Sequence, residues 1–277
     1  MSPPAYRRAT LAALVLLTTI VVTGAAVRLT GSGLGCTDWP NCEEGKLVSP
    51  LELHPMIEFG NRVFTGLVVV AVAVAVLGSI RREPRRNDLV WLSWGLVAGV
   101  VGQIVLGGIT VLFDLNPALV ASHFLLSLAL VTDAVVLHHR ASIYDSGVAS
   151  GRFCSPQDTR IASALLFVAL LVVMAGTVVT GTGPHGGDET AHRFQLVMTD
   201  VARVHSVLVW VLVGLTVVLA VRTRHRAVLV LLAVELAQGA IGYTQYFMGV
   251  PPLLVAFHVV GALAVWIAAL RVRIALA

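Results

Sequence analysis

Charged side chains are scarce in this sequence of 277 residues: they make up 12% of it, whereas 57% of the residues are hydrophobic. Soluble domains carry about twice that share of charge, so the composition excludes a water-soluble fold. The basic residues are scattered among short segments and form no stripe or arm, which argues against a nucleic-acid partner. The chain is therefore expected to have membrane lipid as its solvent.

Long polar stretches are also scarce, because apolar segments of membrane-spanning length take up most of the chain. A helix needs about 20 mostly apolar residues to cross a bilayer. Eight segments meet this requirement: 9–27, 57–79, 89–112, 118–138, 160–181, 201–221, 227–247 and 253–270. The sequence predicts an all-α integral membrane protein with eight transmembrane helices.

The loops predict the orientation of these helices. Most of the nineteen basic residues fall in segments that are cytoplasmic if the N-terminus is inside, as short cytoplasmic loops retain Lys and Arg. The opposite loops carry mainly acidic residues. We expect a multi-pass protein of the cell membrane with both termini in the cytoplasm.

The two halves of the chain repeat one another. The interval of twenty residues between a Gln and a His occurs twice, with a Gly four residues after each Gln: Gln103, Gly107, His123 and Gln238, Gly242, His258. The end of the first span, Gly24–Gly33, is likewise similar to the end of the fifth, Gly176–Gly183. Such a duplication of four helices predicts two parallel four-helix bundles related by a pseudo-twofold axis along the membrane normal.

The repeat also predicts the domain boundaries. Residues 1–138 would form the N-terminal bundle and residues 160–277 the C-terminal bundle. Residues 139–159 between them are expected to be a plain cytoplasmic connector, which contains Cys154 as a lone thiol.

Three histidines lie inside apolar helices at similar depth, where a polar ring needs a partner or a metal ion. His205 and His258 come from different helices of the second half and can supply both axial ligands of a haem iron. In the first half His123 corresponds to His258, but Asn61 stands where the repeat places His205. The first half therefore offers one strong iron ligand, and a haem there would keep a position open.

Glu58 is an acidic residue inside the second predicted span, close to Asn61 and Arg62 on the same helix side. A carboxylate at this depth costs a few kcal/mol on insertion scales. It is expected to be protonated, to pair with Arg62, or to take part in chemistry.

Cys36 and Cys42 form a close pair in the first outer loop, on the oxidising side of the membrane. A disulfide is expected, with a structural or a redox-active role. The loop lacks two further soft ligands, which argues against a metal site at this pair.

These motifs together resemble the haem A synthase family over nearly the whole chain. The resemblance is carried by the loop from Thr30 to Cys42, which reads Thr-Gly-Ser-Gly-Leu-Gly-Cys-Thr-Asp-Trp-Pro-Asn-Cys, by Ile57 to Arg62, and by the helices with the three histidines. It implies an oxidoreductase that converts the C8 methyl of haem O into a formyl group, giving haem A for cytochrome oxidase. The partners that this implies are haem O, a haem O synthase and an unidentified electron donor.

The resemblance also implies roles for single residues. It places a haem b cofactor between His205 and His258, and the iron of the substrate haem on His123. Glu58 corresponds to the catalytic Glu of the family, with Asn61 and Arg62 beside the substrate haem. This sequence departs from the family at Asn61, where a His is usual.

Two other functions use similar features. A dihaem membrane electron carrier would need the same bundles, but it favours two irons with both axial positions filled. A transporter would share the internal repeat, but the sequence shows no matching pair of interrupted short helices.

Overall fold

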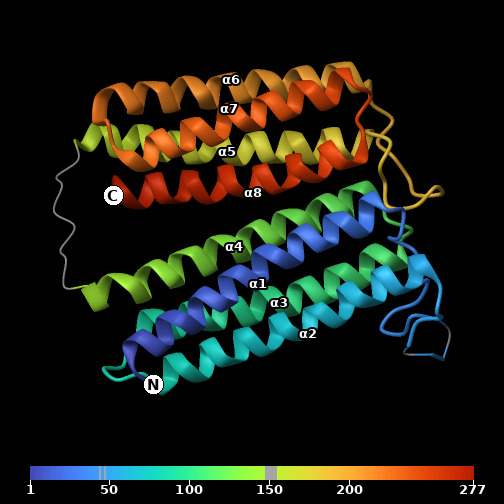
Figure 1. Cartoon of the computed structure of the whole chain (residues 1–277), viewed down its shortest axis with the longest axis horizontal. Helices are drawn as coiled ribbons and strands as arrows, with labels where there is room; N and C mark the ends of the chain where they lie inside the picture. Colours follow the sequence, from blue (N-terminus) through green and yellow to red (C-terminus); the bar gives the residue numbers. More distant parts are fainter. Residues whose placement is uncertain (44, 47, 147–154) are drawn as a thin grey trace. The chain divides into compact units, whose positions relative to one another are not determined.

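The computed structural model describes residues 1–43, 45–46, 48–146 and 155–277, and within these ranges it has helices and no β-strand (Figure 1). The eight helices are α1 (Pro3–Leu29), α2 (Leu53–Ile80), α3 (Asn87–Leu112), α4 (Pro117–Ser146), α5 (Pro156–Thr182), α6 (Met198–Thr223), α7 (Arg226–Phe247) and α8 (Pro252–Ala275). Each is long and apolar enough to cross a membrane. The predicted all-helical fold with eight membrane-spanning helices is confirmed.

The surface of the helices supports the same conclusion. Large apolar side chains point outward along them: Trp91 is 76% exposed and Phe247 79% exposed. Apolar surface of this extent is unfavourable in water and favourable against lipid tails. The chain is a multi-pass membrane protein.

Several helices extend beyond the apolar segments that predict them. Helix α1 begins at Pro3, because proline is well suited to a first helical turn, where its missing N–H leaves no hydrogen bond unmade. Helix α5 begins at Pro156, where the Ser155 hydroxyl accepts a hydrogen bond from the backbone N–H of Gln157.

The predicted connector is therefore shorter than residues 139–159 suggest. Its residues 139–146 belong to α4, and 156–159 belong to α5. Hydropathy marks only the part of a helix inside the hydrocarbon, whereas the backbone hydrogen bonds continue into the polar region. Cys154 lies outside the described residues.

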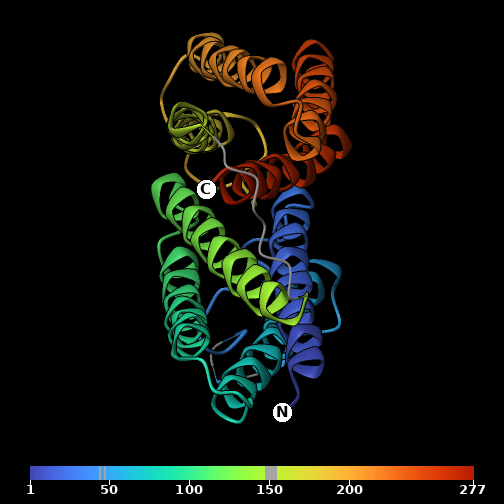
Figure 2. The same ribbon diagram turned by 90° about the vertical axis from the view of Figure 1, so that its left-hand side faces the viewer.

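The chain divides into two compact units, residues 1–150 with 187–192, and residues 151–186 with 193–277. In the first unit α1 packs against α2 and α4, and α3 packs against α2 and α4. The second unit repeats this order, with α5 and α7 each packed against α6 and α8 (Figure 2). Each unit is a four-helix bundle in which the second and fourth helices face each other diagonally; the pseudo-twofold axis between the units stays a prediction.

Candidate functional site

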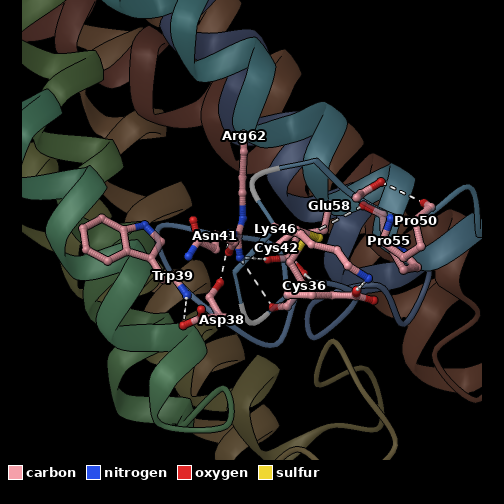
Figure 3. Close-up of a disulfide and its surroundings, with 12 residues drawn as sticks. Cys36, Asp38, Trp39, Asn41, Cys42, Lys46, Pro50, Pro55, Glu58 and Arg62 are labelled. Carbon is pink, nitrogen blue, oxygen red and sulfur yellow. Dashed lines mark hydrogen bonds and ion pairs between the residues drawn. A yellow bond between two sulfur atoms is a disulfide. The ribbon is translucent and has the colours of Figure 1, made fainter.

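The loop between α1 and α2 is closed by a disulfide between Cys36 and Cys42 (Figure 3). Both cysteines are fully buried. The guanidinium group of Arg62, which extends from α2, occupies the centre of this disulfide loop (residues 36–42). It donates hydrogen bonds to the carbonyl oxygens of Asp38 at 3.1 Å and Asn41 at 2.8 Å. An arginine suits this position because its planar fork carries several donors in fixed directions.

Glu58 lies on α2 one helical turn before Arg62 and contacts the same loop. Its Oε1 lies 2.6 Å from Nη2 of Arg62, and its Oε2 accepts a hydrogen bond of 2.7 Å from the backbone N–H of Cys36. The residue is 6% exposed. Of the alternatives that the sequence leaves open for Glu58, the structure shows the ion pair with Arg62.

Two small residues, Gly35 and Ser32, allow the loop to approach the start of α2 closely. A Cβ atom on Gly35 would lie 2.5 Å from the carbonyl carbon and oxygen of His54, which are backbone atoms and cannot turn aside. The buried Ser32 hydroxyl is hydrogen-bonded to Nδ1 of His54 at 2.9 Å. The Gly-Ser-Gly-Leu-Gly-Cys motif thus holds Cys36 within hydrogen-bonding distance of Glu58. The hydrogen bond between Ser32 and His54 links the loop to the start of α2.

We expect Gly35→Ala to push the loop away from α2 and to break the hydrogen bond between Cys36 and Glu58. The disulfide should then be reduced by a mild thiol at least tenfold faster than in the wild type, because local opening exposes it. The control is Gly66→Ala on α2, where an added Cβ meets nothing within 4 Å. Equal reduction rates in the wild type and in Gly35→Ala would contradict this account of the motif.

In the second bundle, His205 of α6 and His258 of α8 face each other with ring centroids 6.5 Å apart. Metal–imidazole bonds are about 2 Å long, so two rings that share one metal ion have centroids about 6 Å apart. Nδ1 of His205 is 3.0 Å from the carbonyl oxygen of Val172. A hydrogen bond from Nδ1 leaves Nε2 as the free electron-pair donor, which is the usual arrangement of a metal-bound imidazole.

The opposite ring, His258, lacks such a contact in the part of the chain that the structure describes. Nδ1 of His258 is buried and has no hydrogen-bond partner among the described residues. A buried polar atom without a partner costs free energy, so this nitrogen differs from Nδ1 of His205, which has one. The separation of the two rings and the Nδ1 contact of His205 fit a haem held by two imidazoles. No group of three or more His, Cys, Asp or Glu side chains gathers as a metal cluster in the described ranges.

The repeated glutamines and glycines contact the same atoms in both bundles. Gln103 donates to the backbone carbonyl of His123 at 3.1 Å, and Gln238 donates to that of His258 at 2.6 Å. A Cβ on the glycine four residues after each Gln would lie within 3.2 Å of Cε1 of the same His. The interval of twenty residues thus reflects a contact between neighbouring helices that positions each imidazole.

The first bundle differs on the facing helix. His123 has a buried Nδ1 without a described partner, as His258 does. Asn61 does not join Glu58 and Arg62 at the loop; its Oδ1 instead accepts a hydrogen bond of 2.7 Å from the hydroxyl of Thr23 on α1. Thr23 is a site residue that the sequence analysis misses, since a single threonine in an apolar helix gives no signal by itself.

Comparisons with known proteins identify the family of this chain. A family model described as COX15-CtaA, cytochrome oxidase assembly protein, matches residues 7–54 and 49–184, well over half of the chain. His205 and His258 lie beyond that match.

Proteins named Heme A synthase are similar over shorter stretches. That of Geobacillus kaustophilus (strain HTA426) is 30% identical over 106 residues, 38% of this chain and 32% of that protein. That of Lysinibacillus sphaericus (strain C3-41) is 33% identical over 129 residues, 46% and 41% respectively. That of Shouchella clausii (strain KSM-K16) is 35% identical over 130 residues, 46% and 42%. The chain spans about a third to two fifths of the length of these relatives.

Proposed function

Since this chain belongs to the COX15-CtaA family of cytochrome oxidase assembly proteins, we propose that it is a haem A synthase, which oxidises the C8 methyl of haem O to a formyl group. The observation that carries the proposal is the unequal pair of histidine sites. The second bundle presents two facing imidazoles, whereas the first presents His123 opposite Asn61, with a buried carboxylate nearby on α2. One site with two imidazoles and one with a single imidazole would suit a reaction that needs an electron-transfer centre and a separate substrate.

In this proposal His205 and His258 hold haem b, and His123 holds the iron of haem O. A haem b held by these two residues would supply electron transfer. Val172 orients His205 through its carbonyl, and Gln238 orients His258 by holding the backbone at that residue. Rigid ligands favour electron transfer because little rearrangement accompanies a change of charge.

The methyl carbon gains oxygen and loses hydrogen during the reaction, so protons as well as electrons must leave it. We propose that Glu58 accepts a proton or stabilises positive charge that develops near the methyl. Its two oxygens are already engaged, one by Arg62 and one by the N–H of Cys36. These two contacts orient the carboxylate, and exchange of either for a substrate contact would free an oxygen for proton transfer.

In this proposal, contacts with Arg62 and the disulfide loop stabilise the charge of the buried Glu58. Arg62 neutralises it, and Arg62 is in turn held by loop carbonyls. The disulfide closes the loop that carries those carbonyls. In this proposal the disulfide therefore has a structural role in presenting Glu58.

The proposal is tested by the haem extracted from membranes of cells that express this chain together with a haem O source. The wild type should yield haem A, identified by chromatography and mass spectrometry. Glu58→Gln, which keeps the size of the side chain and loses its charge, should yield at least tenfold less. The matched control is Glu52→Gln, because Glu52 is exposed six residues earlier and its replacement should leave the yield unchanged.

The main competing function, a dihaem electron carrier, predicts another outcome. The wild type and Glu58→Gln would then both give haem B and unchanged haem O, although the purified proteins carry haem. That result would overturn the synthase proposal.

A further inference from the structure

The first bundle has a polar pair where the second bundle has a histidine. Asn61 and His205 occupy equivalent places: each lies beside a glycine of the preceding helix, Gly24 and Gly176. A Cβ on Gly24 would lie 3.9 Å from Nδ2 of Asn61, and one on Gly176 would lie 3.3 Å from Cε1 of His205. The residue before the glycine also differs between the halves.

That neighbouring residue is Thr23 in the first half and Ala175 in the second. The Thr23 hydroxyl donates to Oδ1 of Asn61 at 2.7 Å and also lies 3.1 Å from the carbonyl oxygen of Ile20 in its own helix. The first half therefore replaces an Ala and a His by two polar residues that are hydrogen-bonded to each other. Where the first half lacks the imidazole, Asn61 stands in its place and has Thr23 as a hydrogen-bond partner.

The hydrogen bond determines what Asn61 can do chemically. An amide offers one oxygen, which could coordinate a metal, and one NH₂ group, which can only donate hydrogen bonds. Thr23 engages the oxygen. The hydrogen bond from Thr23 fixes the orientation of the amide, and the NH₂ group remains available as a donor, so Asn61 is suited to hydrogen-bond a ligand.

There is space beside this amide. A hollow of about 260 Å³ lies between α1 and α2 and is lined by Thr23, Ala26, Val27, Ile57, Gly60, Asn61 and Phe64. The equivalent hollow between α5 and α6, about 220 Å³, is lined by Ala175, Val178, Asp200, Val201 and Val204 and has no amide. The hollow between α1 and α2 has room for a small molecule and has Asn61 in its lining.

We propose that Asn61, oriented by Thr23, is a hydrogen-bond donor to a small oxygen-containing ligand, of the size of a diatomic gas, that binds the iron held by His123. This inference rests on the proposed function, because it requires a haem in the first bundle. The absence of a second imidazole leaves the iron open for this ligand, and the amide makes the open position selective for a ligand that accepts a hydrogen bond.

Carbon monoxide is the probe for this position. The protein, purified with its second-bundle haem and reconstituted with haem O, is reduced and exposed to carbon monoxide. The second bundle does not react, because two imidazoles fill its iron, so the signal reports the first bundle. In the wild type the C–O stretching band should show the lowered frequency of a hydrogen-bonded ligand.

The variants separate the contributions of the two residues. Asn61→Leu should raise the C–O stretching frequency and speed dissociation about fivefold, the effect of one lost hydrogen bond. Thr23→Val should shift the band in the same direction by a smaller amount, because the amide loses its orienting partner. The control is Thr18→Val, since the Thr18 hydroxyl bonds only the carbonyl of Leu14 in its own helix.

A gain-of-ligand variant provides an independent check. Thr23→Ala combined with Asn61→His reproduces the pair found in the second half. It should give a second bis-imidazole spectrum and abolish carbon monoxide binding.

The possible failures can be told apart. A carbon monoxide band that is the same in the wild type, Asn61→Leu and Thr23→Val would overturn the role of the pair and leave the synthase proposal standing. A reduced first-bundle iron that is six-coordinate in the wild type and five-coordinate in Asn61→Leu would mean that Asn61 binds the iron itself, which also overturns it. Absence of any haem in the first bundle of all variants would overturn both proposals.

Discussion

Replacement of either His205 or His258 by alanine is expected to abolish the bis-imidazole haem spectrum of the purified protein and to lower its haem content by one haem per chain. The two rings face each other at 6.5 Å, a separation that suits one shared iron. Loss of one ligand leaves a single imidazole opposite a cavity, and the affinity for haem falls steeply. The measurements are the absorption spectrum of the reduced protein and the haem-to-protein ratio.

The control for this prediction is His225→Ala. Nδ1 of His225 accepts a hydrogen bond from the backbone N–H of Ala227 and so caps the start of α7. Loss of such a cap costs about 1 kcal/mol of stability and should leave the haem spectrum unchanged. A normal bis-imidazole spectrum in both His205→Ala and His258→Ala would disprove the assignment of the two ligands.

The second large effect is expected for Arg62→Leu. The substitution removes the counterion of Glu58 and the donor to the Asp38 and Asn41 carbonyls, and it leaves a buried carboxylate unpaired. Breaking a buried ion pair by removing one partner costs about 3–5 kcal/mol. Local opening of the disulfide loop should therefore become at least about a hundredfold more frequent, since 1.4 kcal/mol corresponds to roughly a factor of ten.

The measurement is the rate at which Cys36 and Cys42 are reduced and labelled by a thiol reagent under native conditions. Lys46→Met is the matched control, because Lys46 and Glu43 form an ion pair nearby in the α1–α2 loop at 3.2 Å with 72% and 40% exposed side chains. Exposed pairs contribute about 0–1 kcal/mol, so this variant should be reduced at nearly the wild-type rate. Equal rates for Arg62→Leu and Lys46→Met would mean that the disulfide loop is held by other contacts.

The two bundles have the same order of helix contacts but differ in the side chains around their histidines. Both keep the Gln that donates to the His backbone and the Gly that lies against the imidazole. On the facing helix, the second bundle has His205 where the first has Asn61. The Gln and Gly contacts that position the histidine are thus the same in both halves. The proposed roles of the halves differ because the second has two facing imidazoles and the first has one.

The sequence by itself determined the fold class, because spans of apolar residues leave a chain no alternative to helices in a bilayer. It also determined the repeat, because the interval from Gln to His recurs with the same length, and it singled out Glu58, Arg62 and the three histidines, since polar groups in such helices need partners. These are local properties of composition and spacing. They can be read from the order of residues along the chain.

Only the tertiary structure decided which of these residues have hydrogen-bond partners in the same segment of the chain. Glu58 and Arg62 turn toward the disulfide loop, whereas Asn61, between them in sequence, turns toward Thr23 on α1. Helical spacing places side chains on a face, but the direction in which each finds its hydrogen bond depends on the loop and helix packed against that face. The close approach of Gly35 to the His54 backbone was invisible in the sequence for the same reason, because it is a contact between segments that the chain brings together only on folding.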